Sequence, residues 1–198
     1  MKQHIVSMTR RAAIAVCTAA LAYTSVHSVQ AADKPPRVKF ATTQGDIVVE
    51  LAPEKAPKTV QNFLQYVRDK HYDDTIFHRV INGFMIQGGG YTADLGQKPT
   101  RAPIPLEANN GLKNDKYTIA MARTMDPDSA TAQFFINVQD NAMLNAPNPD
   151  GYGYTVFGKV VSGAEVVDKI KAVPTGTRNG MENVPLQPVT IRSAVLVK

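Results

Sequence analysis

The sequence predicts a mainly β protein with two α-helices, and three observations support this fold class. Short apolar runs recur along most of the chain and are separated by turn-forming Gly, Pro, Asn and Asp residues. Only two segments repeat their apolar residues with the spacing of a helix. The chain has 198 residues, of which 43% are hydrophobic and 20% charged, and this composition is typical of one soluble domain with a sizeable core.

The first 31 residues have the features of a cleavable secretory signal peptide. A basic region that contains Arg10 and Arg11 precedes the short apolar stretch 12–23, and small residues at 29–31 favour cleavage after Ala31. The apolar stretch is shorter than the about 20 residues that a membrane-spanning helix needs. Two alternatives stay open: an uncleaved membrane anchor, and export by the twin-arginine route, although the residues around Arg10 and Arg11 match that pattern poorly.

Removal of this segment changes what the composition implies. Residues 1–31 hold three of the 22 Lys and Arg residues and none of the 17 Asp and Glu residues, so the formal charge falls from +5 to about +2. This modest charge argues against nucleic-acid binding. The only cysteine, Cys17, leaves as well, and the bulky Val16 before it does not suit lipid attachment. A cysteine-free exported protein fits an oxidising compartment, and we expect the periplasm.

The mature chain is predicted to begin with a β-hairpin and a helix. Residues 38–43 and 46–51 flank Gln44-Gly45, and the second run alternates apolar residues on one face. A helix follows from Pro57, a residue that suits the first helical turn. The helix has one apolar stripe with the spacing i, i+3, i+4, i+7, formed by Val60, Phe63, Leu64 and Val67.

From Phe77 onward the chain reads as short strands divided by loops. The apolar runs are 84–87, 117–122, 134–138, 155–161 and 189–197, and the loop-like segments are 98–105, 125–129 and 145–153. A second helix is predicted over residues 164–173 and is ended by Pro174. Periodicity alone therefore predicts a mainly β fold with two helices, without the order of its strands.

The segment with the sequence FHRVINGFMIQGGG, residues 77–90, is the most informative in the chain. It places Arg79 among apolar side chains, with Phe84, Met85 and Gln87 close behind. A guanidinium is always charged and carries five hydrogen-bond donors, so placing it against apolar groups is costly unless it has partners. We therefore expect that this arginine has a function.

This segment resembles the signature of the cyclophilins, which are peptidyl-prolyl cis/trans isomerases. Residues 118–137 (TIAMARTMDPDSATAQFFIN) and 156–161 (VFGKVV) are similar to two further cyclophilin segments, and the similarity covers residues 38–197. The resemblance implies a closed eight-stranded antiparallel β-barrel capped by two α-helices. It also implies that residues 32–198 form a single prolyl isomerase domain that uses no cofactor and no metal.

The resemblance assigns roles to individual residues. Arg79 is the catalytic donor, and Phe84 and Gln87 act with it. The substrate-binding residues are His78, Met85, Ala122, Arg123, Gln133, Phe135, Met143, Leu144 and Tyr154. Met143 stands where tryptophan or phenylalanine is common in the family, so any binding of cyclosporin should be weak. We expect His78 to have a packing or hydrogen-bonding role rather than to act as an acid or base.

The expected activity is isomerisation of X-Pro bonds during the folding of exported proteins. The partners are then proline-containing unfolded or partly folded polypeptides, bound by a monomer without nucleic acid or stable membrane association. An alternative from another class is a non-catalytic proline-peptide-binding chaperone module on the same fold, which would not need a competent Arg79. A phosphate-binding role for residues 88–90 is not favoured, because the Lys-Ser/Thr pair of such loops is missing.

Overall fold

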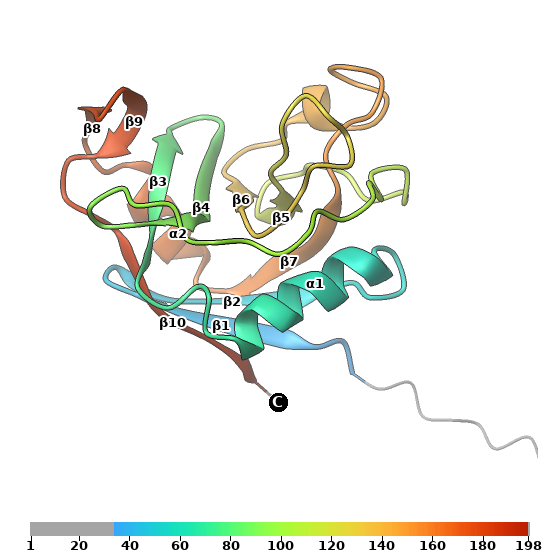
Figure 1. Cartoon of the computed structure of the whole chain (residues 1–198), viewed down its shortest axis with the longest axis horizontal. Coiled ribbons are helices and arrows are strands. Elements are labelled where there is room, and N and C mark those ends of the chain that lie inside the picture. Colours follow the sequence, from blue (N-terminus) through green and yellow to red (C-terminus); the bar gives the residue numbers. More distant parts are fainter. Residues whose placement is uncertain (1–33, 198) are drawn as a thin grey trace, which may run out of the picture. The chain divides into compact units, whose positions relative to one another are not determined.

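Eight strands close into an antiparallel barrel in the computed structural model, which describes residues 34–197 (Figure 1). The predicted signal peptide and its cleavage site lie outside the described residues. Around the barrel the order is β1-β10-β3-β4-β6-β5-β7-β2, which confirms the predicted closed barrel. The strands are β1 (Arg37–Thr42), β2 (Gly45–Leu51), β3 (Thr75–Ile81), β4 (Met85–Thr92), β5 (Thr118–Met121), β6 (Phe134–Asn137), β7 (Val156–Ser162) and β10 (Thr190–Val197).

Two α-helices accompany the barrel, as the periodicity predicts. α1 (Pro57–Arg68) begins at the predicted proline and buries Val60, Phe63 and Val67 of its apolar stripe. α2 (Ala164–Lys171) ends two residues before the predicted position, because the N–H groups of Ala172 and Val173 bond to carbonyls three residues back, as in a 3₁₀ turn. Within residues 34–197 no helix combines the length and the apolar character that a membrane crossing requires.

The N-terminus of α1 is capped by a carboxylate from a distant part of the chain. Ala56, the N-cap residue, has no side chain that can cap the helix. Glu107 instead accepts hydrogen bonds from the backbone N–H of Lys58 at 3.1 Å and from the backbone N–H and hydroxyl of Thr59 at 2.9 and 2.7 Å. A negative charge at this position also complements the helix dipole. The contact fastens the long connection between β4 and β5 to α1.

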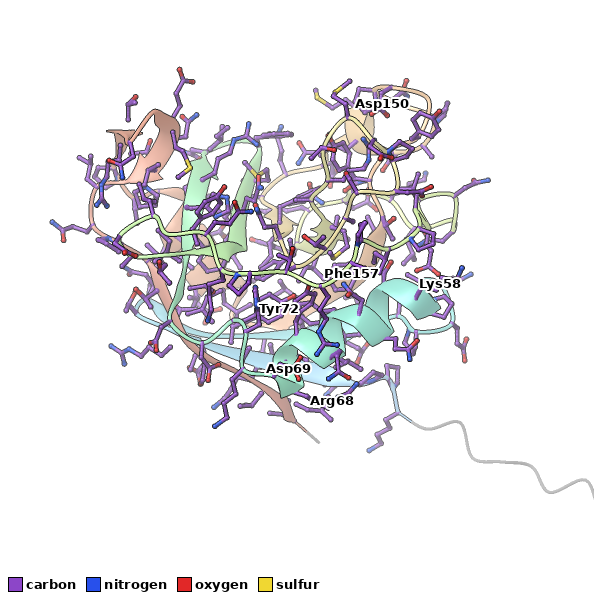
Figure 2. All side chains as sticks on the ribbon, viewed as in Figure 1. Lys58, Arg68, Asp69, Tyr72, Asp150 and Phe157 are labelled. Carbon is purple, nitrogen blue, oxygen red and sulfur yellow. The ribbon has the colours of Figure 1, made fainter. Side chains whose placement is uncertain are left out.

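Aromatic rings fill the barrel core. Phe40 stacks on Phe134 with ring centroids 5.1 Å apart, and Phe63 of α1 approaches Phe157 at the same distance. Tyr72 is fully buried, and its hydroxyl donates to the carbonyl of Ala132 at 2.9 Å. Figure 2 shows Tyr72 and Phe157 in the interior and Arg68 on the outer side of α1. Core packing thus joins the first helix to strands from both halves of the barrel.

A hairpin outside the barrel, β8 (Thr175–Arg178) and β9 (Met181–Pro185), was not predicted. It forms a separate two-stranded sheet and stands beside β3 (Figure 1). Asn179 and Gly180 at its turn have φ angles of 49° and 77°. Such Asn-Gly turns match the twist of a hairpin, so this pair was a usable signal in the sequence. β4 also extends beyond the predicted run 84–87. The sequence pattern does not show its second half, because that half is rich in glycine, which has no side chain to alternate.

Candidate active site

Strand register places two of the predicted catalytic residues, Arg79 and Gln87, in one row with Phe135, a predicted substrate-binding residue. Arg79 of β3 is opposite Gln87 of β4, Gln87 is opposite Phe135 of β6, and Phe135 is opposite Ala120 of β5. Since side chains alternate along a strand, neighbours such as Ile86 and Phe134 point into the core instead. The sheet therefore presents a charged, a polar and an aromatic side chain side by side on one face.

A β-bulge in β3 sets the direction of the arginine. Phe77 is opposite Gly88 and Arg79 is opposite Gln87, so β3 has one more residue than β4 in this interval, and that residue is His78. The side chain of Phe77 is buried in the core, whereas Arg79 is exposed. Bulges commonly redirect a side chain beside an active site. Here the extra residue allows Arg79 to lie on the same face as Gln87.

The row opens into a small depression, the apolar hollow, of about 110 Å³. Its floor belongs to a buried cluster separate from the main core, built from Met85, Phe135 and Leu144. Tyr154 closes one side, with its ring edge-to-face to Phe135 at 5.7 Å. The hollow is small and largely apolar at its floor, which suits a compact apolar group. It is lined by Arg79, Phe84, Met85, Gln87, Ala122, Arg123, Phe135, Leu144 and Tyr154.

A chain of polar contacts orients the groups at the mouth of the hollow. Gln87 accepts a long hydrogen bond of 3.4 Å from Arg79 and donates one of 3.0 Å to Gln133. Gly90 makes room for Gln133, since a Cβ at this position would lie 2.6 Å from that side chain. Among the described residues, no carboxylate forms an ion pair with Arg79. Its charged donors are therefore available to a ligand in the hollow.

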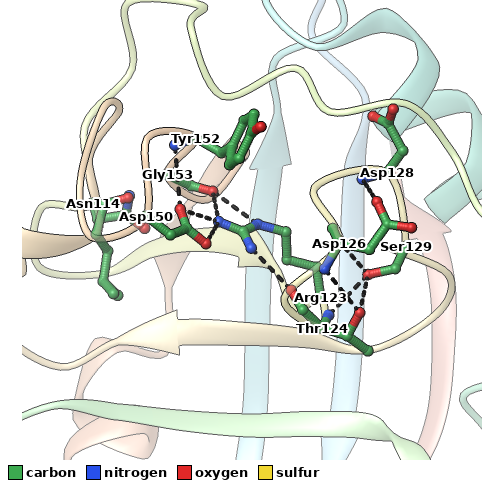
Figure 3. A network of polar contacts seen from close by, with 10 residues as sticks. Asn114, Arg123, Thr124, Asp126, Asp128, Ser129, Asp150, Tyr152 and Gly153 are labelled. Atoms are coloured by element: carbon green, nitrogen blue, oxygen red, sulfur yellow. Dashed lines mark hydrogen bonds and ion pairs between the residues drawn. The ribbon is translucent and has the colours of Figure 1, made fainter.

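Arg123 is part of the lining of the hollow, and its side chain lies in a network of polar contacts with Asp150 and Gly153 (Figure 3). Its side chain is only 1% exposed and donates to Asp150 at 2.8 Å and to the carbonyl of Gly153 at 2.7 and 3.0 Å. The guanidinium also stacks over the ring of Tyr154, 4.5 Å from the centroid. The hydrogen bond from Arg123 holds the pKa of Asp150 below its ordinary value. The exposed surface of Arg123 is consequently its backbone, which remains open to a peptide.

Buried asparagines join the two walls of the hollow, and sequence reasoning missed them. Asn141 donates to the carbonyl of Phe84 at 2.7 Å, and Asn114 donates to the carbonyl of Leu144 at 3.1 Å. Asn137 lies between them, donating to Asn114 at 3.2 Å and accepting from Asn141 at 2.7 Å. The network thus holds the backbone of two lining residues of the hollow, Phe84 and Leu144. Nothing in the sequence pattern distinguishes these asparagines from those of exposed loops.

Three of the predicted site residues lie outside the apolar hollow. His78 and Gln133 line a neighbouring depression on the other side of Arg79. Burial lowers the pKa of His78 to about 4, with a smaller contribution from the positive charge of Arg79, so the imidazole is neutral near pH 7. The packing or hydrogen-bonding role of His78 stays a prediction. Met143, in the 3₁₀ turn η1 (Ala142–Leu144), is 63% exposed and lines neither depression, so its role in substrate binding stays a prediction.

Comparison with known proteins gives a consistent match. The family described as cyclophilin type peptidyl-prolyl cis-trans isomerase/CLD matches residues 37–196. The peptidyl-prolyl cis-trans isomerase cyp18 of Streptomyces antibioticus is 62% identical over 81% of this chain and 98% of its own length. A crystal structure of a Cryptosporidium parvum cyclophilin type isomerase, obtained in the presence of the dipeptide ala-pro, has a TM-score of 0.67 and 28% identity, and covers 82% of this chain and 99% of its own.

The chain therefore belongs to the cyclophilin-type peptidyl-prolyl isomerases, and its activity is peptidyl-prolyl cis-trans isomerisation. Within that family it is similar to bacterial isomerases of the A and B types. Isomerase B of Escherichia coli K12 is 57% identical over 80% of this chain and 98% of its own length. Isomerase A of Dickeya dadantii is 49% identical over 96% of this chain and 100% of its own length.

Proposed function

We propose that this protein accelerates X-Pro isomerisation in exported polypeptides while they fold, and that Arg79 is the group that lowers the barrier. The observation that carries the proposal is the position of Arg79. Its exposed guanidinium lies at the mouth of the apolar hollow, and no described carboxylate neutralises it. An apolar floor beside a free charged donor suits a proline ring next to a polar amide.

The mechanism follows from the origin of the barrier. Rotation about a peptide bond costs about 18–20 kcal/mol because the nitrogen shares its lone pair with the carbonyl. Met85, Phe135 and Leu144 would hold the pyrrolidine ring, and Arg79 would donate a hydrogen bond to the proline nitrogen. This bond competes with amide resonance and favours the twisted state. A charged hydrogen bond contributes about 1.5–3 kcal/mol, which corresponds to a rate factor of roughly ten to a hundred.

The remaining contacts would hold the peptide on either side of the rotating bond. Gln87 is placed to meet the carbonyl that swings, and its orientation is fixed by Gln133. The exposed backbone at Arg123 offers strand-like pairing to an extended segment. The relative from Cryptosporidium parvum that was crystallised with ala-pro supports the view that the ligand is a proline peptide. Much of the acceleration would come from this positioning.

The test is the cis-to-trans rate of a short X-Pro peptide with the wild-type protein, Arg79→Ala and Arg79→Lys. We expect Arg79→Ala to lower kcat/KM about ten- to hundredfold. Arg79→Lys should recover only part of this loss, because an ammonium lacks the planar fork of donors. Circular dichroism provides the control for folding. Equal turnover by a folded Arg79→Ala protein would remove Arg79 from the mechanism.

The proposed site of action is the periplasm, after cleavage of residues 1–31. The basic region with Arg10 and Arg11, the short apolar stretch 12–23 and the small residues at 29–31 support this proposal. We expect the protein expressed from the full sequence in a Gram-negative host to appear in the periplasmic fraction with Ala32 as its first residue. N-terminal sequencing of that fraction is the measurement. Recovery of uncleaved protein in the membrane fraction would indicate the anchor instead.

A further inference from the structure

A second depression, the hairpin hollow, adjoins the apolar hollow and has a volume of about 420 Å³. The two hollows share Arg79 and Gln87. The far wall of the hairpin hollow comes from the turn side of β9, with Met181 and Glu182. A polypeptide whose proline occupies the apolar hollow continues past Arg79 and Gln87, which line both hollows. An extended chain advances about 3.3 Å per residue. A residue close to the proline is thus within reach of the hairpin hollow.

The lining of the hairpin hollow combines apolar, polar and charged side chains, namely Tyr91 and Met181, then His78, Gln87, Gln133 and Asn183, then Arg79 and Glu182. The ring of Tyr91 packs against the imidazole of His78 with centroids 4.6 Å apart, and Met181 adds a flexible apolar surface. Glu182 is exposed and forms no ion pair or side-chain hydrogen bond within residues 34–197. Because His78 is neutral near pH 7, the full charges that line the hollow are those of Arg79, which the apolar hollow shares, and of Glu182 on β9.

Two features of the hairpin hollow are open to a ligand. Tyr91 and Met181 supply apolar surface, and Glu182 supplies an exposed carboxylate. The Nδ1 atom of His78 forms no hydrogen bond in the described part of the chain, but it is buried and is therefore not a contact for the ligand. A long side chain with an apolar stem and a cationic head fits the two open features together.

We propose that the hairpin hollow selects substrates in which a lysine or arginine flanks the proline, with Glu182 facing the cation; this inference rests on the proposed function. The stem of the side chain would cross Tyr91 and Met181, as long basic side chains do on apolar surface. Repulsion from Arg79 would keep the cationic head near Glu182. An acidic side chain would instead be drawn to Arg79 and would compete with the proline nitrogen for its donors.

The experiment uses three otherwise identical X-Pro peptides with Lys, Gln or Glu at the flanking position, prepared for each side of the proline. For the wild-type protein we expect a two- to fivefold higher kcat/KM for Lys than for Gln on one side, the size expected of an exposed ion pair. The preference should shrink as salt is added. Glu182→Gln should abolish it, and Glu182→Lys should transfer it to the Glu peptide.

Glu54→Lys is the matched control, because Glu54 is exposed, lines neither hollow and undergoes the same change of charge. Its Lys-to-Gln ratio should equal that of the wild type. An unchanged ratio in Glu182→Lys, or an equal change in Glu54→Lys, would overturn the inference. Turnover of the Gln peptide tests the proposed function separately. Peptide dissociation constants from NMR titration test the Lys preference even if turnover is absent.

Discussion

Arg79 and His78 are neighbours in the chain, yet one side chain is exposed and the other is buried. The bulge in β3 separates them, because in a strictly alternating strand Arg79 would share a face with Phe77, which is buried in the core. The sequence predicts Arg79 as the catalytic residue because of its motif. The bulge itself depends on pairing with a glycine-rich strand, and local sequence does not show it.

The environment of His78 predicts a pH-dependent stability. Its folded pKa of about 4 lies below the unfolded value of about 6.5, so the unfolded state binds the proton first as the pH falls. Stability is therefore complete above pH 6.5 and is lost on acidification down to about pH 4. Between pH 7 and pH 5 the wild type should lose roughly 2 kcal/mol more unfolding free energy than His78→Gln.

Urea unfolding of both proteins at pH 7 and pH 5 measures this difference. Burial also lowers the pKa of His71, but that residue is present in both proteins and its effect cancels. Parallel loss of stability in the wild type and in His78→Gln would show that His78 does not carry the pH dependence.

At the scale of elements, a helix or strand could be predicted where its own residues show a hydrophobic period. The first hairpin and both helices have a clear period of two or of 3.6 and were predicted to within a few residues. β4 was only partly predicted, because the three glycines from Gly88 to Gly90 have no side chains to alternate. The pocket residues at 84–87 belong to one contiguous motif, whereas the asparagines that join the walls come from separate segments that only the fold brings together.

The distant cap on α1 gives a prediction for one element. Replacing Glu107 by Gln removes the charge at the helix N-terminus and one of the two carboxylate acceptors. We expect the unfolding free energy to fall by about 1–2 kcal/mol. Chemical denaturation provides the measurement, with Glu54→Gln as an exposed control. A loss no larger than that of the control would show that α1 depends on packing alone.

At the scale of the whole molecule, the site depends on contacts between segments far apart in the chain. Arg123 ties the strand edge at Ala122 to the loop that carries Tyr154, and this bond network forms one wall of the apolar hollow. Arg123→Met should therefore raise KM about tenfold, the value of one charged hydrogen bond, with a smaller change in kcat. Arg37→Met, which removes a surface ion pair with Glu50, is the control.

Separate measurements of kcat, KM and unfolding free energy distinguish positioning from general stability. A positioning role shifts KM in protein that is still fully folded at the assay temperature. If Arg123→Met lowers stability while KM stays at the wild-type value, the wall of the hollow is set by other contacts.

The closed barrel has a further consequence for a protein that works among incompletely folded chains. Every strand of the eight-stranded sheet has a partner strand on both sides, although β10 pairs with β3 only at Thr190 and Ile191, so the closed sheet has no edge strand. Edge strands present rows of unpaired backbone N–H and C=O groups, which are templates on which exposed segments of other chains add as extra strands and begin to aggregate. A folding catalyst built on this barrel can therefore bind incompletely folded polypeptides without offering them an edge strand of its main sheet on which to aggregate.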